Sequence, residues 1–188
     1  RSVLLKEISG GEAGTQMFII ASADRNYGIG NRGGLLCRVS ADMKNFRALT
    51  EGKTVILGSK TLATFPGGRP LKNRRNIIMS RRPEYTVEGA EVVHSLEELL
   101  ALPGISDAAV IGGEGIYRLL LPYCDRAVIT EFDAEFPADA FLPKIPDLPG
   151  WEKESESGTF YAAENDSSPG TAWRIVTYTN RSPRSIVQ

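Results

Sequence analysis

The stretch AAVIGGEGIYRLLL, residues 108–121, holds a strand and a helix with only a glycine pair between them. The apolar run 108–112 predicts a strand. Residues 114–121 predict a short helix, which ends before Pro122 because proline cannot continue a helix. A strand that leads directly into a helix is the repeating unit of α/β proteins, in which helices cover a mostly parallel sheet.

The same alternation runs along most of the chain. Apolar and β-branched runs predict eight strands, at residues 17–23, 54–58, 75–80, 90–94, 108–112, 126–132, 151–157 and 172–179. Helices are expected at 40–50, 59–64 and 114–121, and after Ser95, which opens a capping box with Glu98. No helix separates the last two strands, which predicts a C-terminal antiparallel hairpin. We therefore expect one α/β domain with an eight-stranded, mostly parallel mixed sheet flanked by about four helices.

The composition excludes several classes of protein. The 22 basic and 23 acidic residues nearly cancel, which leaves no electrostatic footprint for nucleic acid. No apolar run approaches the roughly 18 residues that a membrane span needs, and no signal-peptide pattern opens the chain. Cys37 and Cys124 are too few for a disulfide framework, and with His94 as the single histidine we expect no metal site. These features favour a cytoplasmic protein, which we expect to be a monomer.

The domain is expected to carry short extensions at both ends. Residues 1–16 mix Gly, Glu and Lys with one apolar patch, so we expect a leader outside the fold, whether natural or artificial. Residues 17–180 form the predicted domain, and residues 181–188 are expected to be a tail. Residues 133–150 contain four prolines and form one long loop, a length that is typical of functional segments.

A glycine-rich segment follows the first predicted strand. Gly28, Gly30 and Gly33 fit the GxGxxG spacing of a dinucleotide fingerprint. That fingerprint opens a helix at its third glycine, whereas no helix is expected here before residue 40. We therefore favour a mobile loop beside a site, or a plain turn, over a Rossmann motif.

Glycines and basic residues also follow three later strands. Gly112–Gly113 and the segment ILGSKTL, residues 56–62, each join a strand directly to a helix. Ligands gather at the carboxyl ends of parallel strands, and helix N-termini present free N–H groups to anions, so two such ends could hold one pyrophosphate. Arg81 and Arg82 would then favour a 2′-phosphorylated dinucleotide. Alternatively, the glycines only permit tight turns and the arginines are solvated surface charge.

The segment GGLLCRVSADMKNFRAL, residues 33–49, places an acid on an apolar stripe. If Ser40 caps the helix, Asp42, Phe46 and Leu49 share one face, because steps of four and three residues return to the same side. One interpretation is electrostatic, since an acid in the first turn gains roughly 0.3–1 kcal/mol from the helix dipole. The other is functional, with the carboxylate and the ring in one binding site.

Taken together and in this order, the GIG loop, ADMKNF, TVILGSKT, RRNIIMS, VIGGEGIY and ITEFDAEFPAD resemble the dihydrofolate reductase family, closest to its bacterial chromosomal type. The resemblance runs from Met17 to Asn180. It implies NADPH-dependent reduction of 7,8-dihydrofolate to tetrahydrofolate, by hydride transfer to C6 and protonation at N5, in support of one-carbon metabolism and thymidylate synthesis. It also implies binding of diaminopyrimidine antifolates.

By matching motifs, the resemblance implies a substrate site and a catalytic pair. Asp42 takes the place of the pterin-binding carboxylate, and Thr130 that of the threonine bonded to it. The other implied substrate contacts are Ile20 and Ile111 along the pterin, Phe46 against the pterin and benzoyl rings, and Arg74 on the α-carboxylate of the glutamyl tail. An acid in an apolar pocket should have a raised pKa. We expect Asp42 to bias the pterin while a water delivers the proton to N5.

The resemblance also implies which residues hold NADPH. Gly112 and Gly113, commonly joined by a cis peptide in the family, fall beside the nicotinamide, and Ser80 with Arg81 falls at the adenosine 2′-phosphate. The remaining implied cofactor contacts are Ala21, Ile29, Gly30, Gly58, Ser59, Lys60, Thr61, Ile111, Gly115, Ile116 and Tyr117.

Two departures from the family pattern stand out. Leu36-Cys37 replaces a frequent Pro-Trp pair whose tryptophan helps to position an ordered water, and Glu114 replaces the third glycine of a frequent GGG. Two other functions remain open: a related reductase for another pterin or a ribosylated pyrimidine, and a nucleotide-binding module without catalysis. The presence of Arg74 and of the Asp42–Phe46 pair favours folate.

Overall fold

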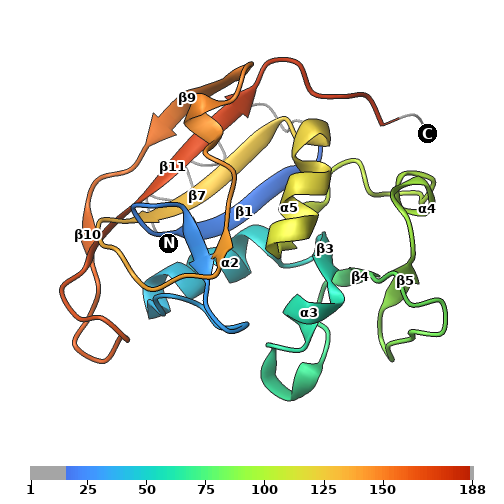
Figure 1. Cartoon of the computed structure of the whole chain (residues 1–188), viewed down its shortest axis with the longest axis horizontal. Coiled ribbons are helices and arrows are strands. Elements are labelled where there is room, and N and C mark those ends of the chain that lie inside the picture. The colour runs from blue at the N-terminus through green and yellow to red at the C-terminus, as the bar shows by residue number, and fades with distance from the viewer. Residues whose placement is uncertain (1–15, 187–188) are drawn as a thin grey trace.

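The computed structural model describes residues 16–186, and its centre is one large mixed β-sheet (Figure 1). Six of its strands run parallel in the order β7-β1-β6-β3-β4-β5. Their bounds are β1 Phe18–Ala23, β3 Thr54–Gly58, β4 Arg75–Met79, β5 Glu91–Val93, β6 Ala109–Gly112 and β7 Arg126–Phe132. Because these strands are parallel, their carboxyl ends meet at one edge of the sheet, where α/β proteins place their ligands.

An antiparallel strand, β11 (Ala172–Asn180), pairs with β7 and extends the sheet on that side. The other side of β11 pairs with both β9 (Trp151–Glu156) and β10 (Phe160–Tyr161), so the nine strands occupy eight positions across the sheet. The expected eight-stranded mixed sheet with an antiparallel C-terminal end is therefore confirmed. The sequence did not predict β10, because two residues are too few to form an alternating pattern.

A second, two-stranded sheet lies outside the main one and was also not predicted. It pairs β2 (Gly28–Gly30) with β8 (Ala140–Phe141) in antiparallel fashion. Glycine is depleted in strands, so the segment GIG gives no strand signal of its own. The pairing attaches the glycine-rich segment to the proline-rich loop that follows β7.

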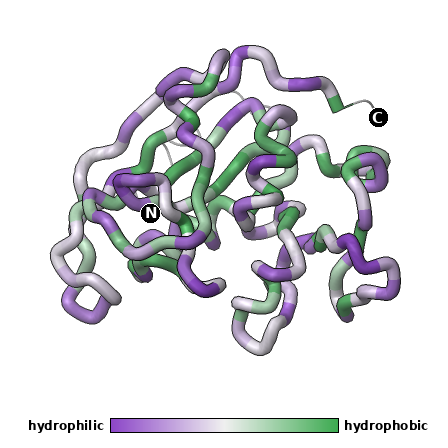
Figure 2. The backbone as a smooth tube through the Cα atoms, in the orientation of Figure 1, coloured by the Kyte–Doolittle hydropathy of each residue, from purple (hydrophilic) through white to green (hydrophobic). Residues whose placement is uncertain are grey.

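Within residues 16–186, four α-helices cover the two faces of the sheet. They are α2 (Ser40–Thr50), α3 (Ser59–Leu62), α4 (Leu96–Leu100) and α5 (Glu114–Leu120), with short 3₁₀ turns η1 (Pro66–Gly68), η2 (Leu121–Tyr123) and η3 (Ile145–Asp147). Leu99 of α4 and Leu120 of α5 pack in the cluster that holds Ile19 of β1, whereas Phe46 and Leu49 of α2 pack in the cluster that holds Ile20. Successive strand residues point to opposite faces, so α2 lies on the face opposite α4 and α5. Figure 2 shows the hydrophobic residues concentrated on the central strands.

Two details of the predicted helices need correction. Ser40 does not cap α2: it is the first helical residue, and its backbone N–H donates instead to Oδ1 of Asp166 at 3.0 Å. A carboxylate from a distant loop thus replaces the local hydroxyl. The second helix ends at Leu62 rather than at residue 64. The predicted cap of α4 is confirmed, with Glu98 N–H donating to the Ser95 hydroxyl at 3.1 Å.

The structure describes the two expected terminal extensions only in part. The expected leader falls almost wholly on residues 1–15, outside the described range. In the expected tail, Arg181 N–H donates to the Gly150 carbonyl at 2.9 Å and Arg184 N–H to the Pro122 carbonyl at 2.8 Å. None of the helices between residues 16 and 186 has the length and apolarity that crossing a membrane requires.

Candidate active site

The carboxyl group of Asp42 meets the hydroxyl of Thr130 where the first turn of α2 crosses β7. Thr130 Oγ1 donates to Asp42 Oδ1 at 2.5 Å. Burial raises the pKa of Asp42 to about 6, and the hydrogen bond from Thr130 opposes that rise. If the Asp42 carboxylate only interacted with the helix dipole, its pKa would be lowered. The pKa is raised instead, so burial has a larger effect than the helix dipole. Asp42 is thus a desolvated acid that changes charge close to neutral pH.

Apolar side chains follow this acid along the same face of α2, as the helical stripe predicts. Phe46 is half-buried on α2 and packs in one cluster with Ile20 of β1 and Ile111 of β6. Ile20 and Ile111 are each 8% exposed, so they form a nearly closed floor in the sheet. The predicted substrate residues around the acid therefore come together.

The guanidinium group of Arg74 lies beside the last turn of α2. Its Nε donates to Thr50 Oγ1 at 3.2 Å and its Nη1 to the Lys72 carbonyl at 2.9 Å. The Thr50 hydroxyl in turn donates to the Phe46 carbonyl at 2.8 Å. Partial burial lowers the pKa of Arg74 from its usual value. The arginine is thus oriented by hydrogen bonds to neutral groups, and the described residues offer it no carboxylate within salt-bridge distance.

The neighbouring arginine is committed elsewhere. Arg75 donates from Nε and Nη2 to the Glu91 carboxylate at 2.6 and 2.9 Å, and from Nη1 to the Pro103 carbonyl at 2.6 Å. Of the two arginines, Arg74 is the one whose guanidinium reaches α2, through its bond to Thr50.

The glycine turns after β3 and β6 pack against each other. A Cβ atom on Gly113 would lie 3.1 Å from Thr61 Oγ1, and one on Gly58 would lie 3.1 Å from Ile116 Cγ1. The Gly112–Gly113 peptide is cis, as the family resemblance implies, and Gly112 has φ of 121°, which a side chain would strain. The two predicted pyrophosphate turns are therefore brought together in a cradle that side chains would fill.

Tyr117 is turned inward rather than toward the sheet edge. Its hydroxyl donates to the Ile20 carbonyl at 2.7 Å, and a Cβ atom on Gly112 would lie 3.3 Å from that hydroxyl. Burial raises the pKa of the phenol well above its usual value. Tyr117 thus connects the apolar floor at Ile20 to the glycine cradle, and its predicted contact with the cofactor stays a prediction.

Basic residues follow β4 at the same edge of the sheet. Ser80 is buried, and its hydroxyl accepts the Arg82 N–H at 3.3 Å. The Arg82 guanidinium lies 4.7 Å from the centre of the Tyr85 ring, whereas the Arg81 side chain is exposed and contacts no acid among the described residues. Lys60 is exposed at the neighbouring turn. Two cations are therefore free to meet phosphate groups along this edge.

The glycine-rich segment is organised by a buried acid that the sequence did not single out. Asp24 Oδ1 accepts the N–H groups of Asn26 and Gly28 at 2.9 and 2.8 Å, and Oδ2 accepts the Phe136 N–H at 2.9 Å. A Cβ atom on Gly28 would lie 2.7 Å from Ala138 Cβ. The segment holding Ile29 and Gly30 is therefore tied to the loop after β7 and forms β2, not a helix start, which confirms that no Rossmann fingerprint is present.

The Leu36–Cys37 pair lies between this segment and α2. Cys37 is buried in an apolar cluster with Val128 and Trp173, and burial raises the pKa of its thiol.

No group of three or more His, Cys, Asp or Glu in the described part of the chain is placed to hold a metal.

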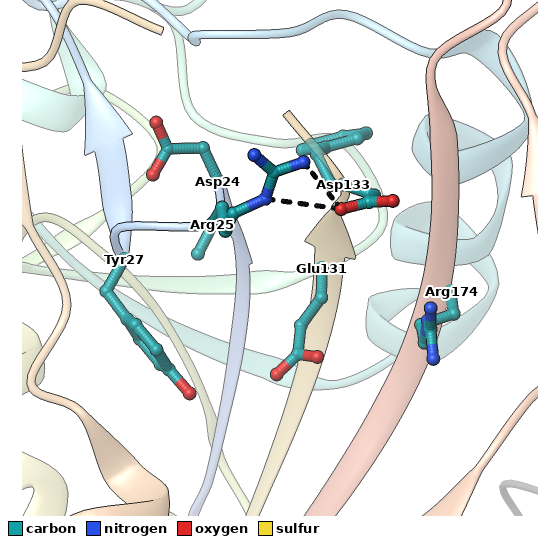
Figure 3. Close-up of a pocket in the computed structure, with 8 residues that line it drawn as sticks. Asp24, Arg25, Tyr27, Glu131, Asp133 and Arg174 are labelled. Carbon is teal, nitrogen blue, oxygen red and sulfur yellow. Dashed lines mark hydrogen bonds and ion pairs between the residues drawn. The ribbon is translucent and has the colours of Figure 1, made fainter. Parts of the chain in front are cut away.

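A separate polar cavity of about 230 Å³ opens at the ends of β1 and β7 (Figure 3). Its charged groups are already paired: Arg25 with Asp133 at 2.8 Å, Glu131 with the Tyr178 hydroxyl at 2.7 Å, and Arg174 with Glu156 at 2.6 Å. Glu131 follows Thr130 on β7 and so points to the opposite face of the sheet. This cavity is therefore distinct from the site around Asp42.

The sequence and the structure are both similar to those of known proteins. Residues 16–179 match the family model described as dihydrofolate reductase. The chain belongs to the dihydrofolate reductase family. It is an NADPH-dependent enzyme that reduces dihydrofolate to tetrahydrofolate.

Several bacterial dihydrofolate reductases align along most of this reductase. The type 3 enzyme of Salmonella typhimurium is 37% identical over 150 residues, covering 79% of this chain and 90% of that protein. The enzyme of Mycobacterium tuberculosis strain H37Rv is 36% identical over 154 residues, covering 80% and 89%. The solved structure of dihydrofolate reductase from Enterococcus faecalis, complexed with NADP(H) and RAB-propyl, superposes with a TM-score of 0.77 at 32% identity, covering 88% of this chain and 96% of that one.

Proposed function

We propose that Asp42 binds the amine edge of the dihydrofolate pterin in this reductase. That edge presents a ring N–H and an exocyclic amine side by side, and one carboxylate can accept both as a forked pair. The observation that carries the proposal is the partly buried Asp42–Thr130 hydrogen bond of 2.5 Å, on the face of the sheet that holds the apolar cluster of Ile20 and Ile111. The flat pterin ring would lie on Ile20 and Ile111, with Phe46 against its other face.

The rest of the substrate would follow α2 toward Arg74. A helix rises 1.5 Å per residue, so the eight steps from Asp42 to Thr50 cover about 12 Å. The acid stands at one end of that length, and the guanidinium held by Thr50 stands at the other. A ligand with hydrogen-bond donors at one end and a carboxylate at the other matches this spacing. We therefore assign the α-carboxylate of the glutamyl tail to Arg74.

The residues at the sheet edge fit NADPH. The cradle made by Gly58, Gly112 and Gly113 is packed so closely that a Cβ atom at Gly58 or Gly113 would lie 3.1 Å from a side chain of the facing turn. NADPH, when bound, supplies the hydride that is added to C6 of the pterin. Ser59, Lys60 and Thr61 would hold the pyrophosphate and adenosine side, and Ser80 with Arg81 the 2′-phosphate. Ala21, Ile29 and Gly30 would lie at the nicotinamide, and the remaining proposed cofactor contacts are Ile111, Gly115, Ile116 and Tyr117.

The proton for N5 would come from water rather than directly from Asp42. A carboxyl group paired with the amine edge stands away from N5, beyond direct reach. With a pKa of about 6, Asp42 holds a proton in part of the population near neutral pH and so biases the electron distribution of the pterin. Thr130 keeps one oxygen of the acid fixed while this occurs.

Kinetics of Asp42→Asn test this role. The variant keeps the size of the side chain and an oxygen that can accept from Thr130, but it cannot change charge. We expect it to lose most turnover near neutral pH while its dissociation constant for NADPH stays unchanged. Turnover close to that of the wild type across the pH range would contradict the role of Asp42.

The proposal extends to the setting of the enzyme. Asp42, Phe46, Arg74 and Thr130 all come from one chain, which supports a reductase that works as a monomer. Cys37 and Cys124 are both free, which supports action in the reducing cytoplasm. Diaminopyrimidine antifolates should bind by pairing a protonated ring with the Asp42 carboxylate.

A further inference from the structure

Asn76 is a buried polar residue in an otherwise apolar strand. It is the second residue of β4, is 2% exposed and is followed by the fully buried Ile77 and Ile78. Burying an amide is unfavourable unless its polar atoms find hydrogen-bond partners. The neighbours that satisfy this amide therefore indicate its purpose.

The Asn76 side chain bonds to both ends of the turn that leads into β4. Its Oδ1 accepts the Leu71 N–H at 2.9 Å, and its Nδ2 donates to the Leu71 carbonyl at 2.9 Å and to the Arg74 carbonyl at 3.1 Å. Within this turn Asn73 has φ of 58°, in the left-handed region that disfavours most side chains. One side chain thus closes a turn with an uncommon backbone conformation.

The same turn determines where the Arg74 guanidinium points. Nη1 of Arg74 donates to the carbonyl of Lys72, which lies inside the turn, and the Arg74 main chain is held by Asn76 directly. Thr50 fixes Nε from the side of α2. A change in the shape of the turn would therefore move both the base of the arginine and one of the two acceptors that orient it.

We propose that Asn76 is a positioning residue for the glutamyl end of dihydrofolate, because it clamps the turn that aims Arg74 at the α-carboxylate. This proposal rests on the role assigned to Arg74 above. Asn76 would then set how strongly the enzyme prefers a pterin with a glutamyl tail over a pterin without one.

The test compares two substrates on the same enzyme. We define the tail preference as kcat/KM for 7,8-dihydrofolate divided by kcat/KM for 6-methyl-7,8-dihydropterin, which carries neither benzoyl nor glutamate. Asn76→Asp keeps the acceptor for Leu71 but places a carboxylate against two carbonyl oxygens, and Asn76→Ala removes all three bonds without adding charge. Because the preference is a ratio, a fraction of unfolded enzyme cancels, so loss of stability alone leaves it unchanged.

Asn180→Asp provides a matched structural control. Asn180 is also buried, donates from Nδ2 to the Cys124 carbonyl at 3.0 Å and accepts the Ser182 N–H at 3.0 Å, but it lies on β11. We expect both Asn76 variants to lower the tail preference about tenfold, the size of one charge-assisted contact. Asn180→Asp should lower the melting temperature and leave the preference unchanged.

Arg74→Ala separates the two proposals. If Arg74→Ala lowers the tail preference and neither Asn76 variant does, the positioning role of Asn76 is overturned and that of Arg74 stands. If Arg74→Ala leaves the preference unchanged, the assignment of the glutamyl carboxylate to Arg74 is itself overturned. A lower tail preference in Arg74→Ala, Asn76→Asp and Asn76→Ala, with an unchanged preference in Asn180→Asp, supports the roles proposed for both Arg74 and Asn76.

Discussion

Thr130 Oγ1 lies 2.5 Å from Asp42 Oδ1, joining a central strand to the first turn of a helix 88 residues away in sequence. Two influences therefore act on one carboxyl group. Burial disfavours its charged form, and the hydroxyl favours it. The balance leaves the pKa near 6, in the range where a change of pH changes the charge of the site.

The ligand-free enzyme should lose stability through Asp42 as the pH rises. The pKa of Asp42 in the folded state, about 6, lies above its usual value of 3.8, so the folded state holds the proton more tightly. The stabilisation is fully present below about pH 4 and is lost between about pH 4 and pH 6. Asp42→Asn removes this loss, so at pH 8 it should be more stable than the wild type by up to about 3 kcal/mol, and at pH 4 little different. Urea unfolding at both values measures the difference. If the free energies of unfolding of the variant and the wild type differed by the same amount at both pH values, the prediction would be contradicted.

Thr130→Val should move the pH dependence of catalysis upward. The hydroxyl lowers the pKa of Asp42, so its removal lets burial raise that pKa further. For the wild type, kcat/KM with dihydrofolate should fall as the pH rises through about 6, and for the variant the fall should occur at higher pH. Thr177→Val, a buried threonine on β11, is the control and should leave the profile in place. An unshifted profile in Thr130→Val would mean that Asp42 does not govern it.

Arg74→Ala should raise KM for dihydrofolate by about 10- to 100-fold, the range for losing one charge-assisted pair, with little change in kcat. The reason is that the guanidinium stands about 12 Å along α2 from Asp42 and so contributes binding rather than chemistry. Arg75→Ala loses the Glu91 pair instead and should keep KM. Steady-state kinetics on both variants decide the matter, and equal effects would refute the distinction between the two arginines.

Gly113→Ala should weaken NADPH binding without abolishing folding. The added methyl would come 3.1 Å from Thr61 Oγ1 and would fill the cradle between the two βα turns. We expect the dissociation constant for NADPH to rise by about tenfold or more, as for loss of one good contact. Gly158→Ala is the control, since nothing lies within 4 Å of a Cβ atom there. Fluorescence titration with NADPH compares them, and wild-type affinity in Gly113→Ala would exclude cofactor contact at this turn.

Arg81→Ala should reduce the preference for NADPH over NADH. The Arg81 side chain is exposed and meets no acid in the described residues, whereas Arg82 stacks on the Tyr85 ring. The ratio of kcat/KM for the two cofactors should fall about tenfold or more in Arg81→Ala, because a guanidinium–phosphate pair is lost. Arg82→Ala should change this ratio less. A larger fall of this ratio in Arg82→Ala than in Arg81→Ala would assign the 2′-phosphate to Arg82.

Much of the fold follows from local pattern. The run AVIG becomes a strand because its residues are buried on both faces, and the glycines after it allow the chain to enter α5 at once. The stripe of Asp42, Phe46 and Leu49 on α2 follows from the period of the helix. In these segments the deciding interactions lie within a few residues of each other, so the sequence carries the information.

Other features depend on partners that local pattern does not reveal. Ser40 is a good capping residue, yet Asp166 accepts its N–H from the far side of the domain. The resemblance chose Arg74 over Arg75, and the structure supplies the physical reason, since Glu91 occupies Arg75 across the β4–β5 pair. Asn76 did leave a signal, an amide within an apolar strand, but only the folded turn shows what it binds.

The bond between Asp166 and Ser40 also has a consequence for synthesis on the ribosome. Residue 166 is made after all six parallel strands have been completed. Until it leaves the exit tunnel, the first turn of α2 lacks this acceptor, and β11 is absent from the side of the strand that bears Thr130. The growing chain can therefore assemble most of its sheet while the acid that meets the pterin is still incompletely held. Activity should arise only after residue 166 and β11 have left the tunnel, and not gradually as the sheet grows.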